Sequence, residues 1–237
     1  MRAGIFTTTI KKILQLGSET RHFTLAFEPL ADFDFKAGQF VNFLIDLPGQ
    51  EKPIKRPYSI ASPPFQRGTL DIVWKRVEGG LVTNHLWTLR EGDQFKVQGP
   101  LGSFTVKTPL PKTILFISTG TGIAPFRSMI QELLRTQAPC EIWNIFGNRY
   151  EDEILYQEEF GQLAAKHANF KNILTVSRPK TWKGESAYVH LMLQKYFSDG
   201  QEKHLYICGL SNMIQAVRET AAAIGFKNEQ IFFEKYA

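Results

Sequence analysis

The hydrophobic pattern of this 237-residue chain changes its period near residue 107. Before that point, apolar and β-branched residues form short runs separated by turn signals, which is typical of strands. After it, short apolar runs alternate with segments whose apolar residues recur at helical spacing. Residues 107–112, KTPLPK, place two prolines between two lysines and resemble a linker. We therefore expect a β domain over residues 1–106 and an α/β domain over residues 112–237.

The first domain is expected to be a small antiparallel barrel. Its strand-like segments are punctuated by turn signals such as Pro48-Gly49 and Pro63-Pro64. Six short strands favour a closed Greek-key barrel, because closure leaves no edge exposed. The pattern predicts strands at 5–16, 21–27, 38–45, 54–61, 69–77 and 94–98, and one helix at 82–89.

In the second domain, short apolar runs alternate with segments of helical periodicity. Short apolar runs separated by helices are typical of buried parallel strands in a doubly wound α/β fold. We expect strands at 114–118, 141–146, 172–177, 204–208 and 230–233, and helices at 125–136, 157–167, 187–197 and 211–224. The apolar face of the first helix is predicted to consist of Phe126, Met129, Ile130, Leu133 and Leu134.

Composition excludes several classes of protein. An apolar content of 43% with 22% charged residues is that of a folded globular protein. No apolar run has the length of a membrane span, and the first residues lack the pattern of a signal peptide, so we expect a cytoplasmic protein without membrane insertion. The only cysteines, Cys140 and Cys208, are too few for a disulfide framework or for the four thiolates of an iron–sulfur cluster.

The net charge of +5 alone does not identify a partner. It suits nucleic acid, anionic cofactors, an acidic protein, or simply a solvated basic surface. The lysines are scattered and the aromatic residues are typical of a core, so nucleic acid is not expected. No metal site is expected either.

A glycine-containing turn follows the first strand of the α/β half. Its glycines allow a sharp turn and close approach of a ligand, and the helix that follows directs its amides and dipole at an anion such as a pyrophosphate. Pro125 suits the first helical turn, although the standard dinucleotide fingerprint has glycine there. A tight turn without any ligand remains an alternative. The candidate residues are Thr119, Gly120, Thr121, Gly122, Ile123 and Pro125.

The barrel half contains two further candidate anion sites. In Arg56-Pro57-Tyr58-Ser59, an arginine fork suits phosphate, a tyrosine ring suits a flat ligand, and strand alternation puts Arg56 and Tyr58 on one face. By themselves these residues favour a plain surface strand. The turn before the 82–89 helix repeats the glycine-then-helix pattern of a pyrophosphate site, through Gly79, Gly80, Leu81, Val82 and Thr83.

Together these motifs resemble the ferredoxin–NADP reductase-like flavoproteins. RPYS at 56–59 is similar to the family's flavin motif, GGLVT at 79–83 to its flavin pyrophosphate site, and GPLGSF at 99–104 to the segment that closes its barrel. GTGIAP at 120–125 is similar to its nicotinamide pyrophosphate loop, and CG at 208–209 and EKY at 234–236 to its last strands. The matches occur in the family's order and cover essentially the whole chain.

The resemblance implies a role for each matching residue. Arg56 would bind the flavin pyrophosphate, Tyr58 would pack on the ring or ribityl chain, and Ser59 would donate a hydrogen bond near flavin N5. Thr83 would complete the flavin phosphate site, and FAD is expected rather than FMN because the 79–83 turn suits a pyrophosphate.

On the nucleotide side, the resemblance puts Cys208 and Gly209 beside the nicotinamide. Tyr236 would cover the flavin until the nicotinamide displaces it, with Glu234 close by. A buried core cysteine and a frayed terminus are the alternatives for Cys208 and Tyr236. In this chain Ala237 follows the tyrosine, which makes its stacking less favourable.

NADPH is expected rather than NADH. Ser177 and Arg178 resemble the pair that grips the 2′-phosphate in NADPH-using members, and no acid follows until Glu185. A solvated basic loop is the alternative, and some NADH-using relatives also carry Ser-Arg.

We therefore expect an enzyme in which hydride passes from the nicotinamide to flavin N5, and electrons then pass singly to a protein such as ferredoxin or flavodoxin. Ser59, Cys208, Glu234 and Tyr236 are the candidate catalytic residues. Alternatives are a reductase of free flavin, a reductase component of an oxygenase or desaturase, and a redox-sensing module without catalysis. A monomer is expected.

Overall fold

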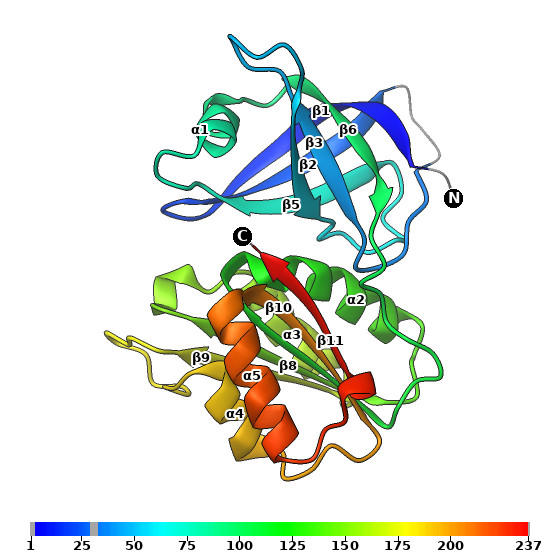
Figure 1. Cartoon of the computed structure of the whole chain (residues 1–237), viewed down its shortest axis with the longest axis vertical. Helices are drawn as coiled ribbons and strands as arrows, with labels where there is room; N and C mark the ends of the chain where they lie inside the picture. Colours follow the sequence, from blue (N-terminus) through cyan, green and yellow to red (C-terminus); the bar gives the residue numbers. More distant parts are fainter. Residues whose placement is uncertain (1–2, 29–32, 237) are drawn as a thin grey trace. The chain divides into compact units, whose positions relative to one another are not determined.

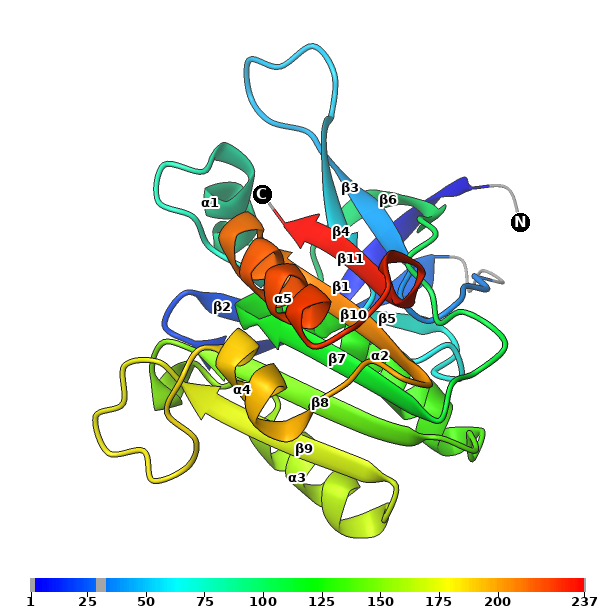
Figure 2. The ribbon, with the colours of Figure 1, turned by 60° about the horizontal axis from the view of Figure 1, so that its bottom comes forward.

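The computed structural model describes residues 3–28 and 33–236, so Ala237 lies outside the described residues. The chain forms two compact units (Figures 1 and 2). The first consists of residues 1–106 together with 124–132, and the second of residues 107–123 together with 133–237. None of the helices in the described part is both long and apolar enough to cross a bilayer.

The first unit contains an antiparallel half-barrel with strand order β4-β3-β6-β1-β2-β5. An isolated bridge between Ile60 and Ile72 links the chain after β4 to β5, the two edges of the sheet. The six predicted strands and the helix are therefore confirmed, with small shifts at their ends. The elements are β1 (Gly4–Gly17), β2 (Thr20–Glu28), β3 (Phe40–Ile45), β4 (Ile54–Ser59), β5 (Thr69–Lys75), α1 (Leu81–Thr88) and β6 (Gln94–Leu101).

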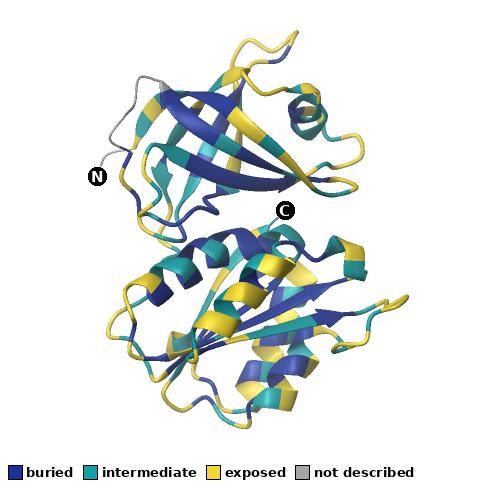
Figure 3. Ribbon diagram, turned by 180° about the vertical axis from the view of Figure 1, so that it is seen from behind, coloured by how far each residue is buried: buried dark blue, intermediate teal, exposed yellow. Residues whose placement is uncertain are grey.

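Alternate side chains of these strands fill the barrel core, since successive residues of a strand face opposite sides. Phe23, Phe43 and Trp74 are among its largest fully buried side chains. The rings of Phe23 and Trp74 meet edge to face at 5.3 Å. Figure 3 shows the buried residues following the strands of both sheets.

A buried carboxylate holds part of the first unit together. One oxygen of Asp71 on β5 accepts a hydrogen bond from the Thr24 hydroxyl at 2.9 Å and lies 3.3 Å from His22 Nε2. Its other oxygen lies 3.2 Å from Arg127 Nη1, which also donates to the Ala61 carbonyl at 3.0 Å. Arg127 belongs to the segment 124–132, so a helical arginine far along the chain completes the barrel's buried charge network.

The second unit is built on a parallel sheet with strand order β11-β10-β7-β8-β9. Helices α4 and α5 pack on one face through Leu193 and Val217, while α3 lies on the other, where Phe160 contacts Phe170 (Figure 2). Helices on both faces confirm the doubly wound prediction. The elements from residue 113 onward are β7 (Thr113–Thr119), α2 (Ile123–Arg135), β8 (Glu141–Asn148), α3 (Gln157–Lys166), β9 (Phe170–Val176), α4 (Val189–Tyr196), β10 (Lys203–Leu210), α5 (Ser211–Ala223) and β11 (Ile231–Tyr236). Residues 124–132 of α2 belong to the first unit.

Most differences from the predicted bounds are at element ends. β11 continues to Tyr236, three residues beyond the predicted strand, because Glu234, Lys235 and Tyr236 pair in parallel with the end of β10. Helix α2 begins at Ile123 rather than Pro125, directly after a 3₁₀ turn at Gly120–Gly122. The predicted apolar face of α2 is confirmed, since all five of its residues are buried.

Replacing Asp71 by asparagine is expected to destabilise the first unit. The neutral side chain leaves the partly buried Arg127 without its counter-charge, which typically costs up to about 3 kcal/mol in free energy of unfolding. Urea unfolding of the two proteins measures the difference. Asp46→Asn is the matched control because Asp46 is exposed. Equal loss of stability in both variants would contradict the role assigned to Asp71.

The same carboxylate predicts a dependence of stability on pH. Burial would raise the pKa of Asp71, but the hydrogen bond with His22 and the charges of His22 and Arg127 outweigh it and lower the pKa to about 2. The unfolded chain therefore binds this proton more readily than the folded one. The stabilisation is complete above about pH 5 and disappears as the pH falls toward 2, by roughly 2 kcal/mol. Unfolding measured from pH 6 to 2 should show the wild type's advantage over Asp71→Asn shrinking, whereas a constant advantage would exclude this linkage.

Candidate functional site

The parallel sheet reverses its strand order between β7 and β10. Strands β8 and β9 follow on one side of β7, and β10 and β11 on the other. In open α/β sheets, ligands bind outside the carboxyl ends of the strands at such a point. Here those ends are Thr119 of β7 and the Cys208–Leu210 segment of β10, which lie side by side because Ser118 pairs with Cys208.

The predicted pyrophosphate turn lies at this point. Gly120 has a φ of 54°, a conformation that disfavours side chains, and Gly122 touches the backbone of β10. A Cβ atom on Gly122 would lie 2.3 Å from the carbonyl oxygen of Cys208. This close approach brings the 3₁₀ turn against the end of β10, and α2 begins directly after the turn. Thr119 ends β7, Thr121 lies within the 3₁₀ turn, and Ile123 and Pro125 lie in the first turn of α2.

Two buried polar atoms lie at the ends of the neighbouring strands. The hydroxyl of Ser118 on β7 and the side-chain amide nitrogen of Asn148 on β8 have no hydrogen-bond partner among the described residues. Buried polar groups are normally paired, so unpaired ones at a candidate site fit a polar ligand. The backbone cradle, the helix start and these two groups together fit a nucleotide.

The structure brings three of the four candidate catalytic residues together. Cys208 and Glu234 are paired residues of β10 and β11, and the Cys208 thiol interacts with Tyr236 two residues further on. Burial, followed by the charge of Glu234, raises the pKa of Cys208 well above its ordinary value, and the hydrogen bond with Tyr236 opposes this only partly. The thiol is therefore neutral at physiological pH, which suits a small polarisable wall rather than a nucleophile. Ser59 belongs to the first unit.

Ser177 and Arg178 follow the carboxyl end of β9. The amide of Ser177 donates to the carbonyl of Asn148 at 2.9 Å, and the amide of Arg178 to the carbonyl of Arg149 at 2.8 Å. Both arginines are exposed. The chain after β8 and the chain after β9 thus remain paired beyond the sheet, and together they carry two cations.

The RPYS segment forms most of β4 in the first unit. Arg56 and Pro57 are exposed, Tyr58 is half-buried, and Ser59 is buried. The Tyr58 ring lies 4.5 Å from that of Phe43, so one side of it packs on the barrel core. Burial raises the pKa of Tyr58 to about 12, against a smaller lowering by the charge of Arg56, so the phenol keeps its proton. The arginine guanidinium donates to the Lys55 carbonyl at 2.9 Å.

The GGLVT segment forms a turn and the start of α1. Gly80 precedes the helix, and Leu81, Val82 and Thr83 form its first turn, where backbone amides have no partner within the helix. The Thr83 hydroxyl accepts a hydrogen bond from the Val77 amide at 3.1 Å, and so it stabilises the turn around Gly79. A phosphate at this position would therefore be met chiefly by backbone amides.

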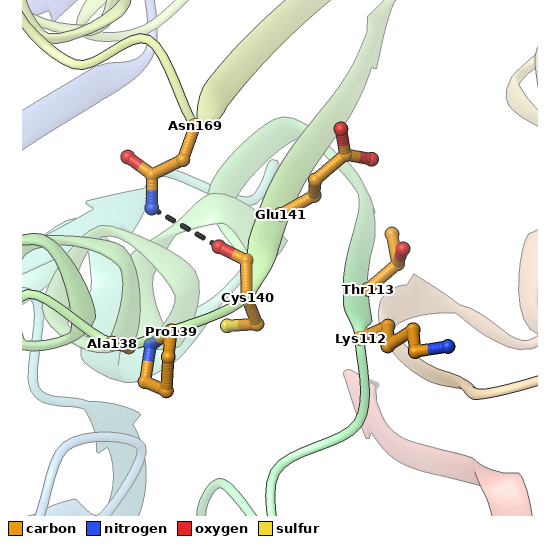
Figure 4. Close-up of a pocket in the computed structure, with 7 residues that line it drawn as sticks. All are labelled: Lys112, Thr113, Ala138, Pro139, Cys140, Glu141 and Asn169. Atoms are coloured by element: carbon orange, nitrogen blue, oxygen red, sulfur yellow. Dashed lines mark hydrogen bonds between the residues drawn. The ribbon is translucent and has the colours of Figure 1, made fainter.

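A separate pocket of about 550 Å³ lies at the other end of the parallel sheet (Figure 4). Lys112 and Thr113 at the amino end of β7, Glu141 of β8 and the nearby Asn169 line it, and Asn169 donates to the Cys140 carbonyl at 3.0 Å. Because dinucleotides bind at the carboxyl ends of strands in this fold, the pocket is distinct from the nucleotide site. The described residues contain no cluster of three or more potential metal ligands of the histidine, cysteine and acidic types.

Sequence reasoning missed the contribution of β8. Asn148, Arg149 and Glu151 lie at or just beyond its carboxyl end, next to the predicted Ser177 and Arg178. The available signal was a run of polar residues directly after a buried strand, whereas Ser177 and Arg178 were predicted from their resemblance to the family's Ser-Arg pair.

Comparison with known proteins finds one family model in each half of the chain. The Oxidoreductase FAD-binding domain model matches residues 7–106, and the Oxidoreductase NAD-binding domain model matches residues 116–219. The ferredoxin–NADP reductase B of Sorangium cellulosum is 37% identical to this chain over 212 residues, covering 86% of each protein. The chain belongs to the ferredoxin–NADP reductase-like flavoproteins. It is an NAD(P)H-dependent flavin oxidoreductase that binds FAD.

Other relatives are named for different functions. The glycine betaine monooxygenase reductase subunit of Pseudomonas aeruginosa is 31% identical over 221 residues, and the chain spans 91% of its own length but only 60% of that relative's. The fold also matches solved structures. The cytochrome P450 reductase GcoB of Amycolatopsis has a TM-score of 0.89 at 23% identity, covering 98% of this chain and 70% of that one. The Neisseria gonorrhoeae ferredoxin NADP⁺ reductase has a TM-score of 0.84 at 18% identity, covering 99% of each.

Substituting Gly122 by alanine in this reductase should impair nucleotide use while leaving flavin binding intact. The new Cβ would overlap the Cys208 carbonyl, so the turn must move away from β10, and a displacement of this size lowers kcat/KM for the nicotinamide nucleotide by about 10- to 100-fold. Steady-state kinetics and the flavin content of the purified protein measure the two effects. Gly161→Ala is the control, since a Cβ at this helical position meets nothing within 4 Å. Unchanged kinetics in Gly122→Ala would show that the turn does not contact the nucleotide.

Proposed function

We propose that this reductase exchanges electrons between NADPH and a separate one-electron carrier of the ferredoxin or flavodoxin type, through its FAD. The observation that carries the proposal is the similarity to ferredoxin–NADP reductase B, which extends over 86% of both chains. A net charge of +5 suits an acidic carrier, because opposite charges increase encounter rates. FAD, when bound, would supply the chemistry that converts two-electron hydride transfer into single-electron transfer.

On the flavin side, the proposed roles follow the exposure of each residue. Arg56 is exposed and suited to the pyrophosphate, together with the backbone amides of the Gly79–Thr83 turn. Tyr58 packs its ring on Phe43, which leaves it oriented by the barrel core for contact with the flavin ring or ribityl chain. Ser59 is the proposed hydrogen-bond donor near flavin N5.

On the nucleotide side, the turn at 119–125 is the proposed pyrophosphate site. The neutral thiol of Cys208 and the backbone of Gly209 are proposed to form a wall of the nicotinamide pocket, with Glu234 and Tyr236 beside them. The interaction between Cys208 and Tyr236 supports this grouping. Arg178, with Arg149 beside it, is the proposed partner of the ribose 2′-phosphate, and it is the basis for preferring NADPH.

A second candidate acceptor is an oxygenase. The reductase subunit of glycine betaine monooxygenase and the electron transfer component of toluate 1,2-dioxygenase are both among the relatives. Because Cys140 and Cys208 cannot ligate an iron–sulfur cluster on this chain, such a partner would have to contribute its own one-electron centre. We also propose that the protein is a monomer and that it is located in the cytoplasm.

Anaerobic reduction of the purified protein tests this function. We expect bound flavin absorbance that NADPH bleaches faster than NADH, and Arg178→Ala should slow reduction by subsaturating NADPH about tenfold without affecting NADH, because a charge-assisted contact to the 2′-phosphate is lost. Lys171→Ala, which removes an exposed charge near the amino end of β9, is the matched control. Adding reduced protein to ferredoxin or flavodoxin then tests the acceptor.

Three results would contradict the proposal. A colourless protein that rapidly reduces added free flavin would indicate a flavin reductase. Bound flavin that neither nucleotide bleaches would indicate a sensing module. Faster bleaching by NADH would reverse the nucleotide preference alone.

A further inference from the structure

The basic loop at residues 177–183, here called the 177–183 loop, is tied to the chain that follows β8. Beyond the two backbone hydrogen bonds of Ser177 and Arg178, the side chain of Glu151 makes further contacts with this loop. Glu151 lies in the 3₁₀ turn at Glu151–Glu153, three residues after the end of β8. Its position puts a carboxylate next to the loop proposed to bind the ribose 2′-phosphate.

Glu151 directs its carboxylate at the backbone of the loop. One oxygen accepts hydrogen bonds from the Thr181 amide at 2.5 Å and the Thr181 hydroxyl at 2.7 Å, and the other from the Lys180 amide at 3.2 Å. The ammonium group of Lys180 lies 4.8 Å from the centre of the Tyr150 ring. The Glu151 carboxylate thus fixes the consecutive amides of Lys180 and Thr181, while the Lys180 side chain packs on Tyr150, the residue before Glu151.

The far end of the loop is fixed independently. Trp182 Nε1 donates to the Glu185 carbonyl at 2.9 Å, and the carboxylate of Glu185 accepts from Lys195 at 2.5 Å and Tyr196 at 2.7 Å. Because Lys195 and Tyr196 are the last two residues of α4, this part of the loop is anchored to that helix. Glu151 is then the side chain that fixes the part nearest Arg178.

An acid at this place has two opposite interpretations. In NADH-using dehydrogenases an acidic residue near the second strand binds the ribose 2′-hydroxyl and repels a 2′-phosphate. Here, however, both oxygens of Glu151 are bonded to loop amides and a hydroxyl. Hydrogen bonds from the backbone and hydroxyl of Thr181 lower the pKa of Glu151 to about 2, so the carboxylate stays ionised and remains an acceptor for these donors at all pH values near neutrality.

We propose that Glu151 is a positioning residue for nucleotide selection, whose hydrogen bonds to Lys180 and Thr181 hold the 177–183 loop so that Arg178 faces the ribose 2′-phosphate. This inference rests on the proposed preference for NADPH. It assigns the acid to support of phosphate binding through the loop, instead of direct recognition of a 2′-hydroxyl.

The test compares Glu151→Ala with Asp152→Ala in the flavin-loaded full chain. Asp152 is the exposed neighbour in the same 3₁₀ turn, so both variants remove one negative charge from one place, and charge alone would tighten binding of a phosphate in both. The probes are 2′-phospho-AMP and 5′-AMP, which differ by the 2′-phosphate alone, with dissociation constants measured by calorimetry.

We expect Glu151→Ala to raise the dissociation constant of 2′-phospho-AMP about tenfold and that of 5′-AMP less than twofold. The variant loses the hydrogen bonds that hold the 177–183 loop, and this loop is proposed to contact only the 2′-phosphate. Asp152→Ala should bind 2′-phospho-AMP as tightly as the wild type or more tightly. Glu151→Gln, which keeps one acceptor oxygen, should lie between Glu151→Ala and the wild type. Faster hydrogen exchange of the Lys180 and Thr181 amides in Glu151→Ala would accompany the loss.

Three outcomes would overturn the role of Glu151. Equal behaviour of Glu151→Ala and Asp152→Ala would show that the hydrogen bonds do not matter for selection. A weaker 5′-AMP complex with unchanged or tighter 2′-phospho-AMP would show that Glu151 binds the 2′-hydroxyl directly. A wild type that binds the two probes equally would instead remove the proposed NADPH preference itself, and the role of Glu151 with it.

Discussion

The candidate nucleotide site depends on the parallel pairing of β7 with β10. These strands are neighbours in the sheet although more than eighty residues separate them in the chain, and the strand order reverses between them. Their pairing brings the turn after β7 against the end of β10, so closely that Gly122 has no room for a Cβ atom. The same pairing places Ser118 beside Cys208, next to the turn at Gly120–Gly122.

Three acidic side chains serve the structure through hydrogen bonds that they accept. Asp71 joins two strands of the half-barrel to Arg127, Glu151 fixes the basic loop after β9, and Glu185 anchors the same loop to α4. In each case the pKa of the carboxyl group is lowered, because donors and cations outweigh the cost of removing the charge from water. Acids near a phosphate site are thus compatible with anion binding when their oxygens already have donors.

The family supplies a common electron-transfer core, and its members serve different partners. Relatives of this chain include a ferredoxin–NADP reductase, the reductase subunit of a monooxygenase and NADH-cytochrome b5 reductases. Because the fold is shared by all of them, it does not select the acceptor or the nucleotide. Selection must come from side chains at the edges of the sites, and the roles proposed for Arg178 and Glu151 are of this kind.

The sequence alone determined the parts whose signals are local. Strand and helix periodicity predicted every barrel strand, every α/β strand and each major helix, and the GTGIAP, RPYS and GGLVT segments identified the candidate anion sites, because turns and helix starts depend on adjacent residues. The tertiary structure decided which distant residues meet. It paired Cys208 with Glu234, brought Glu151 to Thr181, and joined Arg127 to Asp71. These contacts depend on the order and register of the strands, which the hydrophobic periodicity of the sequence does not encode.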